Sequence, residues 1–355
     1  MRFGLDLFPD VGPDHKSPKD YFAEALDIVE YGDQLGFNHC KIVEHYFHPY
    51  GGYSPSPIAF LSAASQRTKQ MKIVTGCVLP VFSHPLKLAG ELAQLDAISG
   101  GRLEIGFARA FLPHEFDAFG VDMDESRRRF EEGIEAMIKV WTEDNSSFKG
   151  EFHQWENVTS LPHMTQKPYP PIWSSAVGSR ESYEWTGKQG FNLMAIPYLQ
   201  PFDRIVENLT LYRDAYRKVK NEEGHVMLVF HLYVAEDGNQ AREEARQYID
   251  HYNAIFYDIA KMWETRSSSA YKNYGGLINA LKNMTYDRII SEGRSIIGSP
   301  EEVVQQVRAA QERYGDVHFS FQINYGGMPV ERAKRSMRLF AEQVRPALEK
   351  QNITT

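Results

Sequence analysis

Short runs of β-branched and aromatic residues alternate along the whole chain with longer segments of helical periodicity, and this alternation restricts the possible folds more than any other feature. One such segment places Phe130, Ile134, Met137, Ile138 and Trp141 on a single apolar stripe of a helix. Eight runs predict strands, at residues 2–8, 39–47, 72–79, 102–110, 171–177, 192–197, 226–235 and 317–324. Strands that alternate with helices pair in parallel, so an α/β protein is expected.

Start and stop signals for helices agree with this interpretation. Ser17 followed by Pro18 is typical of a helix N-terminus, Gly36 suits a C-terminus, and residues 299–302 (Ser-Pro-Glu-Glu) form a capping box. Eight strand–helix units predict a single parallel (β/α)8 barrel of the TIM type, which typically needs about 250 residues. A doubly wound open sheet is the alternative, but it usually carries a glycine-rich turn after its first strand, and no such turn is present here.

The 355 residues exceed a bare barrel by roughly a hundred, so insertions are expected. One is the polar segment 142–170, before the fifth strand. The other, 256–295, lies between the seventh and eighth strands and mixes aromatic anchors with serines and glycines. This mixture predicts a lid, although an ordinary surface excursion with a helix over 271–290 is an equal alternative. The predicted organisation is one barrel domain over 1–350 followed by a tail at 351–355.

Charge and composition argue against several classes of protein. Lys and Arg total 39 against 47 Asp and Glu, giving a net charge of −8 without a basic stripe, which argues against a nucleic-acid partner. Cys40 and Cys77 are the only cysteines, too few for a disulfide framework, so a reducing, cytoplasmic compartment is expected. No run of about 18 apolar residues exists to cross a membrane, and a soluble protein is expected.

Candidate catalytic groups stand where strands end, because barrels of this kind carry their reactive groups there. The second run ends in Glu44 and His45, and strand alternation turns His45 toward the barrel mouth, with Glu44 behind it as an orienting partner. The pair predicts acid–base chemistry; a histidine hydrogen-bonded in the upper core is the alternative. His48 falls on the opposite strand face from His45, and no other strand end offers a matching set of ligands, so no metal site is expected.

A phosphate cradle is predicted from two neighbouring strands. Arg109 lies at the end of the fourth run, where its charge predicts an anionic partner. That partner is either a carboxylate of the protein or the phosphate of a cofactor. Residues 174–179 run from the fifth strand into a helix, where backbone N–H groups and the Ser179 hydroxyl converge. Gly76, within the third run, marks either the close approach of a flat ligand or simple packing against a neighbour.

An ordered series of motifs resembles the bacterial luciferase-like family of flavin-dependent monooxygenases. The motifs cover essentially the whole chain and lie at residues 43–47 (Val-Glu-His-Tyr-Phe), 77–80 (Cys-Val-Leu-Pro), 84–85, 99–109, 113–116, 119–120, 298–302, 326–329 and 336–340. The resemblance implies a (β/α)8 barrel that binds reduced FMN, converts O2 to a C4a-hydroperoxyflavin and inserts one oxygen atom into a small organic or carrier-bound substrate. It also implies a separate flavin reductase, a homodimer formed through the helices after the second and third strands, and a mobile loop at 256–295.

Site residues follow from the resemblance position by position. His45 matches the histidine that handles protons at the flavin–oxygen adduct. The residues implied to hold the cofactor are Thr75, Gly76, Ala108, Arg109, Val177, Gly178 and Ser179, and family members often have a cis peptide near the first two. The residues expected to contact substrate are Tyr46, His114, Gln322 and Asn324. Strongly luminescent luciferases differ at Tyr46, Ala108 and Val177, which argues against light emission and an alkanal substrate.

Three alternatives remain open at this point. The same superfamily contains enzymes that transfer hydride with the deazaflavin F420, which forms no oxygen adduct. Luciferase-type dimers contain a subunit without active chemistry, so a non-catalytic flavin-binding subunit is the second alternative, although His45 and Arg109 argue against it. A metal hydrolase on the same fold is supported only by analogy between folds.

Overall fold

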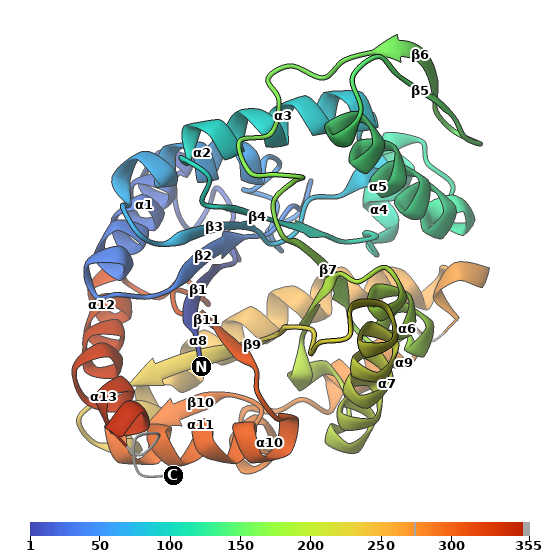
Figure 1. The fold of residues 1–355 in the computed structure, drawn as a ribbon. Helices are drawn as coiled ribbons and strands as arrows, with labels where there is room; N and C mark the ends of the chain where they lie inside the picture. The colour runs from blue at the N-terminus through green and yellow to red at the C-terminus, as the bar shows by residue number, and fades with distance from the viewer. Residues whose placement is uncertain (273–274, 351–355) are drawn as a thin grey trace.

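A computed structural model describes the backbone of residues 1–272 and 275–350, so the predicted tail 351–355 lies outside the described residues. Within this part of the chain, eight parallel strands close into a barrel in the order β1-β2-β3-β4-β7-β8-β9-β11, and β11 pairs back with β1 (Figure 1). The strands are β1 (Phe3–Leu7), β2 (His39–Ile42), β3 (Lys72–Thr75), β4 (Leu103–Phe107), β7 (Ile172–Ala176), β8 (Asn192–Ala195), β9 (Val226–Val234) and β11 (His318–Gln322). The predicted barrel is confirmed, and each predicted run contains one of its strands.

Several strands end earlier than their apolar runs. β2 ends at Ile42, β3 at Thr75 and β4 at Phe107, although each run continues for at least three more residues. After two of these strands the chain turns through left-handed residues, Phe47 with φ 61° and Ala110 with φ 60°, which a β-ladder does not accommodate. The apolar residues beyond the ladder therefore form the barrel mouth.

Helices surround the barrel, and their termini follow the predicted caps (Figure 1). The Ser17 hydroxyl accepts a hydrogen bond from the Asp20 backbone N–H, and both bonds of the Ser299–Glu302 capping box are present. The α-helices are α1 (Pro18–Gln34), α2 (Pro57–Arg67), α3 (Pro85–Ile98), α4 (Pro113–Phe119), α5 (Ser126–Thr142), α6 (Arg180–Lys188), α7 (Phe202–Lys220), α8 (Gly238–Ala260), α9 (Gly275–Lys282), α10 (Tyr286–Ser291), α11 (Pro300–Tyr314), α12 (Val330–Leu339) and α13 (Arg345–Glu349). The short helices are η1 (Pro80–Phe82), η2 (Met123–Glu125), η3 (Pro197–Leu199), η4 (Lys261–Glu264), η5 (Ser269–Tyr271) and the π-helical η6 (Phe340–Val344).

The first insertion, 142–170, contains an antiparallel hairpin that the sequence analysis did not predict. It consists of β5 (Ser146–Lys149) and β6 (Gln154–Val158), and it lies beyond the helical layer at the upper right of Figure 1. Its strands are short and carry few apolar residues, so they lack the alternation from which the barrel strands were predicted.

The second insertion, 256–295, is mostly helical. α8 continues into it as far as Ala260, and the single helix considered over 271–290 is interrupted, because α9 ends at Lys282 and α10 begins at Tyr286. Directly after the insertion, β10 (Ile296–Gly298) pairs with the end of β9. Three residues are too few to show a strand period, so β10 was not predicted.

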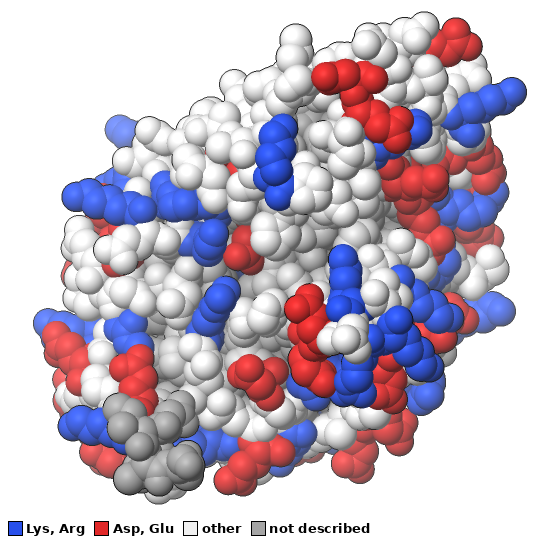
Figure 2. Space-filling view, in the orientation of Figure 1, with Lys and Arg blue, Asp and Glu red and all other residues white. Residues whose placement is uncertain are grey.

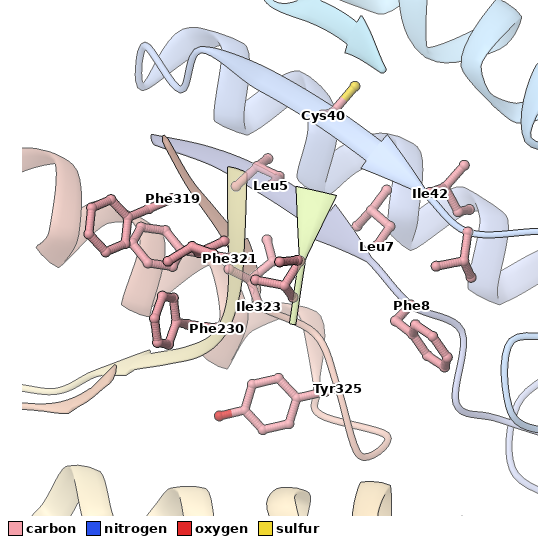
Figure 3. Close-up of a cluster of buried hydrophobic side chains, with 14 of the residues drawn as sticks. Leu5, Leu7, Phe8, Cys40, Ile42, Phe230, Phe319, Phe321, Ile323 and Tyr325 are labelled. Carbon is pink, nitrogen blue, oxygen red and sulfur yellow. The ribbon is translucent and has the colours of Figure 1, made fainter. Parts of the chain in front are cut away.

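The two faces of the strands differ. The outward side chains pack against the helices as one large apolar core, part of which is drawn in Figure 3. Phe321, which is fully buried, lies 6.0 Å from the Phe3 ring and 5.0 Å from the Phe340 ring, between centroids. The inward positions are mixed. Some carry polar side chains, among them Asp6, Lys41 and Gln322, and others form a second, smaller apolar cluster of Val74, Cys77, Trp173, Met194 and Met227.

On the face of the molecule seen in Figure 2, acidic and basic side chains are interspersed and neither sign gathers into a stripe. No helix among the described residues is long and apolar enough to cross a membrane. A search of the same residues shows no group of three or more histidine, cysteine or acidic side chains arranged to hold a metal ion.

Candidate functional site

A cavity opens where the barrel strands end, and the space between protein atoms there, counted together with the open solvent at its mouth, is about 1230 Å³. The predicted site residues that line it are Glu44, His45, Gly76, Ala108, Arg109, Val177, Gly178, Ser179 and Gln322. Much of the remaining lining is aromatic and consists of Phe8, Tyr50, Phe111, Tyr198, Tyr252 and Phe256.

Arg109 lies at the edge of this cavity with part of its hydrogen-bonding capacity unused. Its Nη2 donates to the Ala270 carbonyl at 3.2 Å, and its guanidinium stands 4.3 Å from the centre of the Tyr271 ring. Its Nη1 is buried and has no hydrogen-bond partner among the described residues. No carboxylate in this part of the chain lies within 4 Å of the guanidinium, so the internal-carboxylate alternative is not realised. An arginine in this state is suited to an added anion.

The start of α6 is the second part of the predicted phosphate cradle. Ser179 is the N-cap residue, yet its hydroxyl makes no capping bond and remains available to a ligand. A Cβ added to Gly178 would meet nothing closer than Gln200 at 3.6 Å, so the backbone at Gly178 is open to close approach. Both polar atoms of the Gln200 side chain are buried and have no hydrogen-bond partner among the described residues, and sequence analysis did not identify this residue.

His45 is oriented by Glu115, which the sequence analysis did not assign. Its Nδ1 lies 3.0 Å from Glu115 Oε1, and the same oxygen accepts the Tyr46 backbone N–H at 2.9 Å. Glu115 is fully buried in the first turn of α4. Glu115 Oε1 already accepts the Tyr46 N–H, and when it also accepts from the His45 ring the His45 proton lies on Nδ1 and Nε2 is left as the proton acceptor.

Glu44 does not orient His45, and that prediction is corrected. Its carboxylate accepts the Tyr46 hydroxyl at 2.5 Å and the Leu79 backbone N–H at 3.1 Å. Burial raises the pKa of Glu44 to about 8, against the opposing effect of these two hydrogen bonds. Alternation placed Glu44 behind His45 correctly, but the partner of the histidine comes from a helix that is distant in the sequence.

A side chain at position 76 would collide with Lys41. A Cβ at Gly76 would lie 2.8 Å from Lys41 Cβ, so the stem of Lys41 occupies the space beside it. The Gly76–Cys77 peptide is cis, next to the pair for which the resemblance implied such a bond. The Thr75 hydroxyl does not reach the cavity lining, because it donates to the Gly106 carbonyl at 2.9 Å and accepts the Gly106 N–H at 2.7 Å.

Cys77 is buried, and burial raises the pKa of its thiol to about 12, which agrees with assigning it no chemistry.

Three of the four expected substrate contacts lie outside the cavity lining, and only Gln322 is part of it. His114 Nε2 donates to the Tyr46 carbonyl at 2.8 Å, so both residues stabilise the loop after β2. Asn324 is partly buried beyond the end of β11.

Two further residues of the cavity, Asp6 and Lys41, were missed. Both interrupt otherwise apolar strand runs at inward-facing positions, and Lys41 shares the strand face of Val43 and His45. That interruption was the available signal. Glu115 offered no comparable signal, because only the folded chain brings α4 beside β2.

Comparison with known proteins gives consistent results. A model of the luciferase-like monooxygenase family matches residues 1–316. The oxygenase component of flavin-dependent trigonelline monooxygenase from Acinetobacter baylyi is 29% identical over 99% of this chain and 97% of its own. The monooxygenase RslO1 from Streptomyces bottropensis has a TM-score of 0.86 and 41% identity, covering 98% of this chain and 99% of its own.

More distant structures share the fold. The oxygenating constituent of 3,6-diketocamphane monooxygenase from Pseudomonas putida, solved in complex with FMN, has a TM-score of 0.81 at 18% identity and covers 98% of both chains. An F420-dependent secondary alcohol dehydrogenase has a TM-score of 0.74 at 18% identity, over 98% of this chain and 99% of its own. The family model spans most of the barrel and its cavity, and the chain belongs to the luciferase-like monooxygenase family.

Proposed function

We propose that this chain is the oxygenase of a two-component system and uses reduced FMN and O2 to oxygenate a small organic or carrier-bound substrate. The observation that carries the proposal is the buried, unpartnered Nη1 of Arg109 beside the open N-terminus of α6, in the same cavity as the His45–Glu115 pair. Arg109 and the N-terminus of α6 are suited to binding a phosphate, and the His45–Glu115 pair is suited to transferring a proton.

The residues present fit FMN. Arg109, Gly178 and Ser179 would hold its phosphate, and Gly76, Ala108 and Val177 line the adjoining wall without bulky side chains. When bound, reduced FMN supplies the electrons that activate O2. Tyr271 covers Arg109, and its hydroxyl donates to the Ala110 carbonyl at 2.9 Å, so segment 256–295 has contacts suited to excluding water from the cofactor.

His45 would accept and return a proton at Nε2 during oxygen transfer. Glu115 holds the opposite nitrogen, which selects the tautomer and fixes the ring. The aromatic side chains of Phe8, Tyr50 and Phe111 surround His45 at centroid distances of 6.0, 5.4 and 5.9 Å, which limits the approach of solvent. The substrate would occupy the aromatic part of the cavity.

A separate flavin reductase would supply the reduced cofactor, as the name of the Acinetobacter relative, an oxygenase component, suggests. A homodimer through α2 and α3 is proposed from the family resemblance. Light scattering at micromolar concentration tests it, and a purely monomeric mass would contradict it.

Anaerobic titration of the apoprotein with photoreduced FMN and with reduced F420, followed by rapid mixing with O2, tests the proposed function. We expect tight binding of reduced FMN and a transient absorbing species distinct from both oxidised and reduced FMN. Preference for F420 without such a transient would replace the proposal by hydride transfer. Unchanged turnover in a His45→Ala variant would remove His45 from the mechanism, whereas binding of reduced FMN without any oxygenation would favour a non-catalytic flavin-binding subunit.

A further inference from the structure

A buried ion pair lies on the inward face of the barrel and lines the same cavity. Lys41 Nζ is 2.7 Å from Asp6 Oδ1, and the two side chains are only 4% and 2% exposed. Asp6 is the sole carboxylate within 4 Å of Lys41 Nζ among the described residues. Removing two charges from water costs more than their attraction usually returns, so such a pair is weak evidence of a role in stability alone.

Hydrogen-bonding capacity is unmet beside the pair. Lys41 is the partner of Asp6, and its charge and hydrogen bond oppose the rise in the pKa of Asp6 that burial causes. Gln322 pairs with Asp6 in the β1–β11 register, lines the cavity and is 3% exposed, and its buried Oε1 has no hydrogen-bond partner among the described residues. A cation and two oxygen acceptors therefore meet at one point of the cavity wall, which suits a polar ring edge that both accepts and donates.

The charges in the cavity lining indicate that this polar ring edge belongs to the flavin. Arg109 and Lys41 are the only Lys or Arg side chains in the described lining, and Arg109 is placed for the phosphate. Lys41 is therefore the cation available to the isoalloxazine ring of the cofactor. Oxidised FMN takes up two electrons and one proton to become an anion, so a nearby cation binds the reduced form more tightly than the oxidised form.

We propose that Lys41 and Asp6 set the preference of this site for reduced over oxidised FMN, Lys41 by compensating the charge gained on reduction and Asp6 by opposing it. The inference rests on the proposed flavin binding and adds positioning residues for it. The opposite signs of the two charges give it a specific test, because replacing one residue or the other must move the preference in opposite directions.

The test is anaerobic titration of the apoprotein with oxidised and with photoreduced FMN, without substrate. Lys41→Met is expected to weaken binding of reduced FMN about tenfold more than binding of oxidised FMN, equivalent to a fall of about 30 mV in the two-electron potential. Asp6→Asn is expected to shift the ratio of the two dissociation constants the other way. Lys72→Met, on β3 and outside the cavity lining, is the matched control and should leave the ratio unchanged.

Further variants cover the case in which a single change leaves an unpaired buried charge and prevents folding. Lys41→Arg should keep the ratio within about twofold, because it keeps the charge, whereas Asp6→Asn/Lys41→Met should lower the preference for reduced FMN less than Lys41→Met does. Equal weakening of both flavin forms, an unchanged ratio, or shifts of the same sign at Lys41 and Asp6 would overturn the inference and favour a role in shape or in substrate binding. Failure of the unmodified protein to bind either form of FMN would instead overturn the proposed function.

Discussion

The outward and inward faces of β1 and β11 carry different kinds of side chain, apolar toward the helices and polar toward the cavity. In β1, Leu5 and Leu7 face the helices and are fully buried, whereas Asp6 between them faces the cavity. In β11, Phe319 and Phe321 belong to the outer core, whereas Gln322 lines the cavity. Figure 3 labels Leu5, Leu7, Phe319 and Phe321 among the buried apolar side chains.

This difference separates the residues that stabilise the barrel from those that can bind ligands. The outer layer buries large apolar side chains, and that burial supplies most of the free energy that opposes unfolding. The inner layer can then carry charged and hydrogen-bonding groups that a purely stabilising core would exclude. Substitutions on the two faces should accordingly change different measured quantities.

Phe321→Ala should give the largest loss of stability. Removing a fully buried ring that contacts Phe3 and Phe340 is expected to lower the free energy of unfolding by about 3–5 kcal/mol, measured by denaturant titration. The dissociation constant for FMN should stay unchanged under conditions where the variant is folded. Phe47→Ala, at an aromatic side chain that is 65% exposed, is the control and should change stability by less than about 0.5 kcal/mol. A large loss of FMN affinity in Phe321→Ala would break the separation of the two faces.

Arg109→Ala should give the largest loss of binding. Removing the guanidinium that is proposed to hold the phosphate is expected to weaken FMN binding by about 2–5 kcal/mol, measured by fluorescence titration. The unmodified protein should prefer FMN to riboflavin, and the variant should lose that preference. Arg180→Ala, at an exposed first residue of α6 that pairs with Glu207, should keep it. Equal losses for FMN and riboflavin would place the phosphate elsewhere.

Glu115→Gln tests whether the inner network acts through His45. The amide keeps an acceptor for Nδ1 but removes the charge, so we expect the rate of oxygenation to fall about tenfold. His45→Ala should cost about 10²-fold or more. In a His45→Ala background, Glu115→Gln should have no further effect, because the imidazole through which Glu115 acts is absent. An additive loss in the double variant would show that Glu115 acts independently.

Glu44→Gln should have the smallest effect, and that effect should depend on pH. The folded pKa of Glu44 is about 8 and the ordinary value is 4.5, so between them the folded state keeps a proton that the unfolded state has lost. Rising pH therefore lowers the stability of the unmodified protein across this window. Glutamine cannot ionise, so the Tm of the variant relative to the unmodified apoprotein should rise between pH 5 and pH 8.

The control for this prediction is Glu91→Gln, because Glu91 is paired with Lys87 on the exposed side of α3. It should show no comparable trend in thermal unfolding over the same pH range. A Glu44→Gln difference in Tm that stays constant with pH would mean that Glu44 is ionised in the folded protein throughout.

Much of the fold could be predicted because each barrel element carries its own local signal. β-branched runs, helix stripes and caps at Ser17 and Ser299 act over a few residues, and each was found where expected. The β5–β6 hairpin and β10 were missed because they are too short to show a clear strand period. Strand ends were overestimated because the mouth residues are as apolar as the ladder.

The site was predicted unevenly for a related reason. Arg109, Ser179 and His45 stand at strand ends, where barrel topology alone brings them together. Thr75, His114 and Asn324 were assigned from resemblance or position, and the structure directs the first two side chains into backbone hydrogen bonds away from the cavity and leaves Asn324 outside its lining. Their roles remain predictions that the structure does not support.

The sequence by itself determined the barrel, the order of its elements and the strand ends that carry chemistry, because periodicity, caps and topology are set by neighbouring residues. Only the tertiary structure decided that Glu115 rather than Glu44 orients His45, that Lys41 fills the space beside Gly76, and that Lys41 meets Asp6 in the cavity wall. These contacts join residues from different strands and helices. Their partners depend on how the closed barrel places side chains across its interior, which no local pattern in the chain specifies.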